Sequence, residues 1–501
     1  MHHPPIKGWR RRTAGCRIVL EFAGDSEYTV TISSEVTPAQ LTIDPVAGGN
    51  VIFAGEGVIN LATFTKSGAG KVTLGNGKNP FTTLTVSSGT LALGADQPLS
   101  TETATLYLEQ GATLDLNGHS LFVGTASQQT AENSSAFVTN SNDSVTGTFT
   151  AGCGNTYAYS NRYYVFGGNT RYVTTGRSDN DLRFWGMNNY HTAGTVLSNV
   201  NFRVRSVKQF GTGPIIFTQG AGIDVASTNP NPYDYQNWTQ DIEAYGSDNK
   251  ISYGPASWSP TVTYSGALRG DGERRFSNSG WDPAMTLSGD LSAFTGTFIA
   301  GHSSDSSNKG IFLYNTTSTG LPDADVVQQS TSKDNKLYVS GGSDKTFGSL
   351  ATEVAMPTNA YLLANSATTL VKTGSKSSST YSGALCDYGS NVLSVEKIGA
   401  DTTWTLTGTN HNFSGTFTVT AGKVVFANPQ AVALGSQVVV DANGTIGGSG
   451  SITSPVSFTS GGKVEVSAGA ANTLTFSGDI DASTLTVKLR ENSIPIRNTR
   501  F

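Results

Sequence analysis

The sequence predicts an all-β protein, a long right-handed β-solenoid built from imperfect repeats. Thr, Val, Leu, Phe and Tyr alternate with small polar residues through most of the 501 residues, which is the spacing of strands rather than helices. There are 58 Gly and only 14% charged residues, against roughly 25% in ordinary soluble domains. The 37% of hydrophobic residues fall in period-two runs, which favours buried strands over disorder. Self-similar blocks recur, as in architectures where each unit contacts only its neighbours.

Two matched blocks are the clearest repeat. Tyr-Ser-Gly-Ala-Leu occurs at 264–268 and at 381–385. Each copy is followed by a Leu-(Ser/Thr)-Gly and a Phe-(Thr/Ser)-Gly-Thr-Phe element, at 287–298 and at 406–417. Two blocks in the same order at nearly the same offset indicate a repeated unit that contains several rungs.

The repeats set the predicted domain organisation. Multi-rung copies start near 64, 175, 262 and 380. We predict one continuous solenoid over 30–489, with an irregular N-terminal segment at 1–29 and an irregular tail at 490–501.

One short segment makes the local structure predictable. Ala112, Leu114 and Leu116 alternate with Thr113 and Asp115, so the two sets face opposite sides of a strand. Asn-Gly at 117–118 follows at once, and both residue types accept positive φ at low cost. A short strand followed by a corner is how a coil turns around its core.

On these motifs the chain resembles the autotransporter-associated β-strand repeat proteins, also called passenger-associated transport repeat proteins. The family pattern begins Lys-x-Gly-x-Gly and continues to a Leu-x-Gly and a Gly-Thr-Leu strand. Lys-Ser-Gly-Ala-Gly-Lys-Val-Thr-Leu-Gly at 66–75 matches it, and Lys-Ile-Gly-Ala-Asp at 397–401 matches with Asp401 in place of the second glycine. The resemblance implies a right-handed parallel β-helix of pectin-lyase-like architecture, exported by Gram-negative bacteria and displayed or released at the cell surface.

The termini and the charge bear on location and partners. The net charge of −5 excludes the electrostatic footprint of a nucleic-acid-binding protein. No segment approaches the ~18 apolar residues of a membrane helix, and no signal peptide is visible after the basic Arg10–Arg12. We expect an extracellular or outer-membrane-associated protein, and a chain that is either a fragment or has a mis-called start.

Catalysis is the main alternative, because β-helices also house polysaccharide lyases and hydrolases. Such sites need clustered carboxylates. The pairs at strand spacing are Asp179 with Asp181, Asp241 with Glu243, and Asp323 with Asp325; a basic strip is formed by Arg203, Arg205 and Lys208. Each pair also fits a solvated outer face, so no catalytic residue is assigned. The leading hypothesis is a non-catalytic structural or adhesive passenger, and the alternative is a polysaccharide-active enzyme.

Metal and cofactor chemistry find no support in the sequence. Cys16, Cys153 and Cys386 lie far apart without a CxxC motif, and His119 and His302 sit in Gly-His-Ser turns without a second histidine. No phosphate-binding loop follows a strand. We therefore predict no metal site and no cofactor.

The segment Asn229–Trp238 is the predicted contact element. Its prolines exclude a central strand, so it should be a loop that leaves the coil. Tyr233, Tyr235 and Trp238 are its candidate contact residues, with a surface glycan or a host or matrix component as the expected partner. Aromatic residues within alternating runs fit interior packing better.

Overall fold

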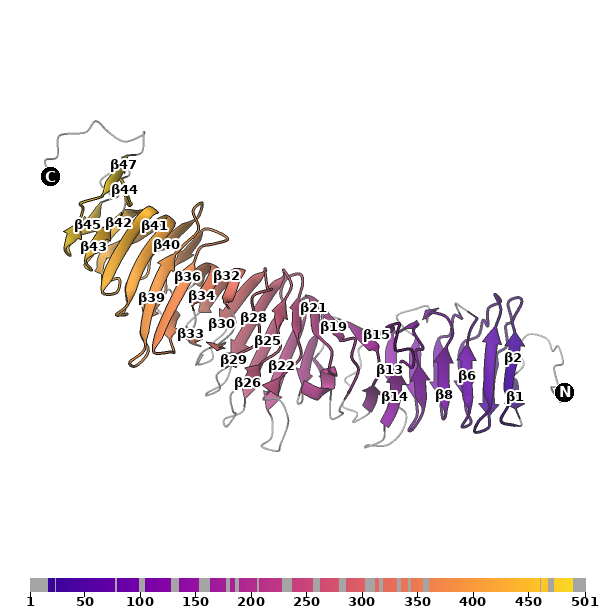
Figure 1. Cartoon of the computed structure of the whole chain (residues 1–501). Coiled ribbons are helices and arrows are strands. Elements are labelled where there is room, and N and C mark those ends of the chain that lie inside the picture. The colour runs from indigo at the N-terminus through magenta and orange to yellow at the C-terminus, as the bar shows by residue number, and fades with distance from the viewer. Residues whose placement is uncertain are drawn as a thin grey trace. The chain divides into compact units, whose positions relative to one another are not determined.

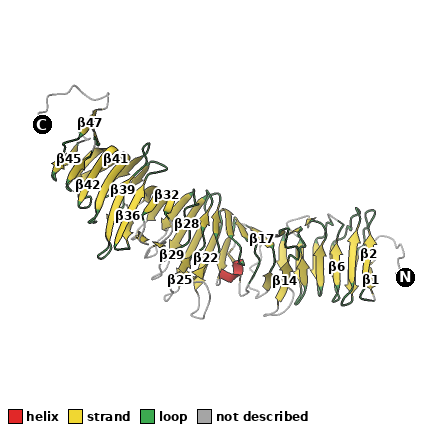
Figure 2. Cartoon of the chain, in the orientation of Figure 1, coloured by secondary structure: helices red, strands yellow, loops and turns green. Residues whose placement is uncertain are grey.

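A computed structural model describes most of the chain. The described residues are 17–22, 24–76, 79–98, 104–127, 135–152, 163–176, 181–184, 189–204, 207–227, 237–255, 262–278, 285–301, 311–314, 319–330, 335–340, 344–354, 360–459, 461–466 and 473–489. Strands dominate, and η1 (Val207–Phe210) is the one helical turn among these residues (Figure 2). The strands stack in parallel as a β-solenoid of about 15 turns, which confirms the predicted fold. Contacts divide the chain into two compact units, Met1–Ile215 and Ile216–Phe501, each described by itself.

Unit 1 is a coil of three parallel sheets, in which successive strands of one sheet come from successive turns (Figure 1). The first sheet contains β1 (Arg17–Phe22), β3 (Gln40–Pro45), β5 (Thr63–Lys66), β7 (Thr83–Val86), β10 (Thr105–Leu108) and β13 (Thr125–Ser127). The second contains β2 (Glu27–Thr31), β4 (Asn50–Ala54), β6 (Lys71–Leu74), β8 (Thr90–Leu93), β11 (Thr113–Asp115), β14 (Ser135–Thr139) and β16 (Tyr163–Phe166). The third contains β9 (Gln97–Pro98), β12 (Ser120–Val123), β15 (Gly147–Gly152), β17 (Thr170–Thr175) and β19 (Thr195–Ser198), while β18 (Asp181–Phe184) pairs with β20 (Asn201–Val204).

Unit 2 has the same parallel organisation. One sheet contains β21 (Ile215–Gln219), β24 (Ile242–Ala244) and β27 (Leu268–Arg269). A second contains β23 (Asn237–Trp238), β26 (Val262–Tyr264), β29 (Met285–Leu287), β31 (Ile311–Tyr314), β33 (Asn335–Ser340), β35 (Ala360–Ala364) and β38 (Ala384–Cys386). The longest contains β22 (Gly222–Ser227), β25 (Lys250–Pro255), β28 (Glu273–Asn278), β30 (Thr297–Gly301), β32 (Gly320–Ser330), β34 (Lys345–Val354), β36 (Thr368–Thr373), β37 (Ser379–Tyr381), β39 (Val392–Lys397), β40 (Thr403–Leu406), β41 (Thr416–Val432), β42 (Gln437–Ile452), β43 (Val456–Phe458), β44 (Lys463–Val466), β45 (Leu474–Phe476), β46 (Ile480–Asp481) and β47 (Thr486–Leu489).

The core is a set of side-chain ladders that run through the interior of each unit. In unit 1, Leu41, Phe64 and Leu84 lie in register on β3, β5 and β7, and each is 5% exposed or less. In unit 2, the ring of Trp404 stacks on Phe417 of the next turn with centroids 6.0 Å apart. Because apolar residues alternate with polar ones along each strand, one set is removed from water on every turn.

The repeated corners explain the sequence repeat. Tyr264 and Leu287 are register partners, and Tyr381 and Leu406 are register partners in the same way. The Ser-Gly after Tyr264 therefore lies under the Ser-Gly after Leu287. A Cβ added at Gly289 would lie 1.8 Å from the Gly266 carbonyl oxygen, so this stack requires glycine. Within each matched block, the two elements thus lie on neighbouring turns with the same corner.

The turn predicted after Leu116 is present. Asn117 and Gly118 have φ of 49° and 85°, and Ala112, Leu114 and Leu116 are fully buried. On the opposite side of the strand, Asp115 accepts hydrogen bonds from the backbone N–H groups of Asn117 and Ser141 at 3.0 and 2.9 Å. The carboxylate therefore fixes the corner and links it to the next turn.

The solenoid begins earlier than the sequence analysis predicts. The segment expected to be irregular at 1–29 contains β1 (Arg17–Phe22) and the start of β2 (Glu27–Thr31). In β1, Ile18 and Leu20 are register partners of Leu41 and Ile43. The repeats that set the predicted boundaries begin only near 64, so they do not indicate this strand. The last strand ends at Leu489, and 490–501 lie outside the described residues.

Candidate functional site

Asp325 is the one predicted acidic residue that lies within an extended polar network among the described residues. It lies on β32, where its neighbours Ala324 and Val326 are completely buried, so strand alternation turns the carboxylate to the outer face. Ser349 of the next turn is its register partner. The side chain keeps 29% of its surface exposed.

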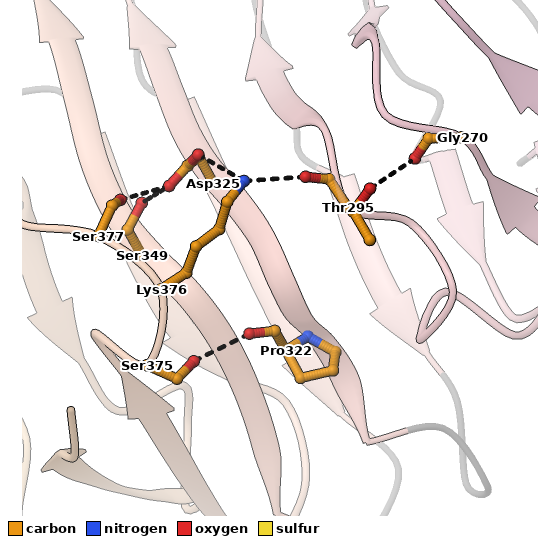
Figure 3. Close-up of polar contacts among 8 residues, drawn as sticks. All are labelled: Gly270, Thr295, Pro322, Asp325, Ser349, Ser375, Lys376 and Ser377. Carbon is orange, nitrogen blue, oxygen red and sulfur yellow. Dashed lines mark hydrogen bonds and ion pairs between the residues drawn. The ribbon is translucent and has the colours of Figure 1, made fainter.

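Two serines donate to one oxygen of this carboxylate (Figure 3). The hydroxyls of Ser349 and Ser377 lie 2.7 and 2.5 Å from Asp325 Oδ1. Ser377 belongs to residues 374–378, here called the Lys376 loop, which connects β36 to β37. The backbone N–H of Lys376 donates to the Gly348 carbonyl on β34 at 2.8 Å. The loop therefore lies back over the preceding turns.

Lys376 extends the polar network to an earlier turn of the chain (Figure 3). Its Nζ lies 2.8 Å from Asp325 Oδ2 and donates to the Thr295 carbonyl at 2.8 Å. The Ser375 hydroxyl donates to the Pro322 carbonyl at 2.9 Å. One loop thus binds the turns that contain Thr295, Asp325 and Ser349.

The charge state of Asp325 is fixed by this network. Burial alone would raise the pKa of its carboxyl group. Hydrogen bonds from Lys376, Ser377 and Ser349, together with the Lys376 charge, outweigh burial and hold the pKa below its usual value. A carboxylate that stays ionised and accepts donors on both oxygens is a structural anchor. It is not poised as a general acid, which needs a raised pKa.

The other acidic pairs are engaged separately. Asp241 accepts a hydrogen bond from the Ala267 backbone at 2.8 Å and lies 3.6 Å from Arg269. Glu243 accepts one from the Tyr245 hydroxyl at 3.2 Å. Asp323 is exposed beside the Asp325 network. Asp179 lies outside the described residues, as do the surroundings of the Asp181 side chain.

Of the three predicted contact residues, only Trp238 lies within the described residues. Tyr233 and Tyr235 lie outside the described residues. Trp238 is completely buried on β23, and its ring centroid lies 5.2 Å from that of Tyr264. The prolines lie before Asn237, so β23 can form at Asn237–Trp238, and the indole of Trp238 packs in the core. Of the basic strip, Lys208 is exposed on η1, and the Arg203 and Arg205 side chains are not described.

The described histidines and cysteines show no arrangement of metal ligands. His119 Nδ1 lies 3.5 Å from an oxygen of Asp96. Cys386 is a buried free thiol, whose pKa is raised by burial. His302, Cys16 and Cys153 lie outside the described residues. Within the described ranges no group of three or more His, Cys, Asp and Glu could hold a metal ion.

Two buried lysines form a feature that the sequence analysis misses. Lys66 and Lys397, which open the two family-like motifs, are both completely buried. Lys66 Nζ donates to the carbonyls of Ser67, Gly68 and Ser88 at 2.9, 2.7 and 2.9 Å. The Lys-x-Gly spacing is the signal, because the glycine that follows each lysine frees a carbonyl to turn back onto the ammonium group.

Lys397 has the equivalent environment. Its Nζ donates to the Gly399 carbonyl and the Thr402 hydroxyl, both at 2.8 Å, and to the Ala421 carbonyl at 3.3 Å. Burial lowers the pKa of Lys66 and of Lys397 to about 8, and for Lys66 the Asp44 charge partly opposes this. Each lysine therefore ties its own corner to the corner of the next turn.

The fold and these contacts define the class, a parallel β-solenoid whose conspicuous polar groups connect turns to one another. No family model, curated protein or solved structure matches the chain. Among the described residues no helix has the length and apolar character needed to cross a bilayer.

Proposed function

We propose that the chain is the non-catalytic structural or adhesive passenger region of a bacterial surface or secreted protein, similar to the autotransporter-associated β-strand repeat proteins. The observation that carries this proposal is the Asp325 network. Of the acidic pairs that an enzyme could use, this one is committed to holding turns together through Ser349, Lys376 and Ser377.

The stacking within each unit supports a mechanical role. Within the described residues of each unit, successive turns hydrogen-bond to one another, and the ladders of buried side chains continue through the same layers. Extending such a stack adds stability turn by turn without a new core. A surface protein that must present a binding site at a distance from the cell benefits from a stack that can be lengthened in this way.

The motif lysines support the family resemblance. Lys66 and Lys397 lie at the same point of two copies of the motif and make the same kind of contacts, with carbonyls of their own corner and of the next. The motif therefore makes the same kind of contact between turns in both copies. A repeated motif that connects stacked turns is typical of a scaffold.

The expected partner is a surface glycan or a matrix component. With Trp238 buried, exposed tyrosines are the better contact candidates, because a ring with one polar edge can stack on a sugar. Tyr190, Tyr245 and Tyr388 expose 52%, 41% and 48% of their surface. The outer faces of both units therefore offer aromatic contacts.

The test combines display with an activity screen. The full chain, fused to an export signal and an outer-membrane anchor, should reach the surface of a Gram-negative host and resist external protease. Cells that display it should adhere to some members of a panel of immobilised glycans and matrix proteins. The purified chain should leave the same glycans uncleaved. Degradation during export would contradict the proposal.

Two matched variants distinguish a scaffold from a polysaccharide-active enzyme. Asp325→Asn removes the anchored charge, and Asp241→Asn changes the other described pair at a site that lacks the loop contact. Both variants should retain adhesion. Cleavage of any glycan by the wild-type chain, abolished in one folded variant and retained in the other, would replace the proposal with the polysaccharide-active alternative.

A further inference from the structure

Arg274 lies inside unit 2 without a counter-charge. Glu273, Arg274, Arg275 and Phe276 alternate along β28, and Phe276 is completely buried, so Arg274 also faces the interior. Its exposure is 0%. Charged residues are almost never fully buried unless they are paired.

The guanidinium has no hydrogen-bond acceptor. Nε, Nη1 and Nη2 are all buried, and none has a partner within the part of the chain that the structure describes. Five N–H donors are therefore unused. Leaving even one buried charged donor unsatisfied carries a large desolvation penalty.

Aromatic faces offset only part of this penalty. The Arg274 guanidinium lies 3.6 Å from the ring centroid of Phe217 and 5.4 Å from that of Phe276. Such contacts stabilise the cation through the ring face. They leave the in-plane N–H donors unused, because these point along the edge of the guanidinium and not at the rings.

Small residues occur beside this group. Phe217, Ala244 and Gly270 follow one another on β21, β24 and the end of β27, and Gly270 bridges to Phe294 on the next turn. All but Gly270 are completely buried. Ala244 thus contributes little side-chain volume on its turn, whereas Gly270 packs directly on the Ala244 backbone, where an added Cβ would lie 2.2 Å from the Ala244 carbonyl oxygen.

We propose that the interior of unit 2 binds a small monovalent anion, such as chloride, against the edge of the Arg274 guanidinium, beside the small side chain of Ala244. This site is independent of the proposed passenger function. The neighbouring polar groups do not supply the charge. Glu273 faces outward and lies 3.5 Å from Arg275, and the Asn249 amide donates to the Tyr245 carbonyl.

The electrostatics agree with an anion. Burial lowers the pKa of Arg274 to about 9, with the Tyr264 hydroxyl partly opposing the shift. Arginine deprotonates so unfavourably that a counter-ion is the more accessible way to neutralise it. The anion would enter as the turns close on one another during folding.

The experiment measures thermal unfolding of the full chain at constant ionic strength, with chloride exchanged against the large anion gluconate. The midpoint should rise by about 2 °C for each tenfold increase in chloride above its dissociation constant. Arg274→Met, which keeps the stem and removes the charge, should abolish the dependence. Arg275→Met, one residue along and facing outward, should retain it.

A crystal of the wild-type chain refolded and crystallised in bromide gives a readout that does not depend on the variants folding. The anomalous signal should place bromide within hydrogen-bond distance of Arg274 in the wild-type chain. Ordered waters alone at the guanidinium would overturn the proposal. Retention of the chloride dependence by both variants, or its loss from both, would overturn it as well.

Discussion

Raising the pH should stabilise unit 2 through Lys397. This completely buried lysine has a pKa lowered by burial from 10.5 to about 8. Below pH 8 the amine is protonated in both the folded and the unfolded chain, so it causes no pH dependence. Between pH 8 and 10.5 the unfolded chain binds more protons, and the free energy of unfolding therefore rises with pH.

The size of the effect follows from the shift. The pKa falls from 10.5 to about 8, and each unit corresponds to about 1.4 kcal/mol, so burying the charged amine costs about 3 kcal/mol at neutral pH. That cost is relieved as the amine deprotonates. Lys397→Met should lack this rise, although it also loses the hydrogen bonds to Gly399 and Ala421.

Urea unfolding at pH 7, 8, 9 and 10, followed by tryptophan fluorescence, measures the difference. Trp404 lies on β40, the strand that follows Lys397, and is 1% exposed. Lys372→Met is the matched control, because the pKa of Lys372 is raised by its hydrogen bond to Asp344 and it does not titrate in this range. Parallel pH profiles for the wild type and Lys397→Met would refute the reasoning.

Three further predictions concern stability. Asp325→Asn should lower the free energy of unfolding by about 1 kcal/mol at pH 7, since the network is partly exposed. Because the folded pKa is depressed, that contribution is present above pH 3.8 and is lost as the pH falls through the lower folded value, so the gap in urea midpoints should close in acid. Gly289→Ala should cost about 2 kcal/mol or more, because its Cβ would collide with the Gly266 carbonyl; an unchanged thermal midpoint would contradict the stacked corner. Trp404→Ala should cost about 3–5 kcal/mol by urea titration, because it empties a core layer and removes the Nε1 hydrogen bond to the Leu350 carbonyl at 3.0 Å.

The local structure is largely predictable from the sequence. Alternation at Ala112–Leu116 predicts the inward set correctly, because a strand has only two faces, and Asn117 has the positive φ that its turn requires. The predicted start of the coil at residue 30 differs from the structure, because β1 (Arg17–Phe22) already pairs in register with β3. The repeats that set the predicted boundaries begin only near 64, so they do not indicate this strand.

The contacts between turns cannot be predicted in the same way. The spacing of Asp325 singles it out, but Ser349 and Ser377 lie 24 and 52 residues away, and only the stacking register brings them to it. The inward position of Arg274 follows from alternation with Phe276. The sequence analysis misses it because a charged residue is expected to face water.

The stacked corners have an evolutionary consequence. Tyr264 and Leu287 occupy equivalent places in consecutive turns, and so do Tyr381 and Leu406. A turn that fits on its neighbour also fits on a copy of itself, because the interface it offers above matches the one it needs below. Duplication of a gene segment that encodes one turn therefore adds a layer without redesigning any other, so chain length in such a protein can change in single, individually viable steps.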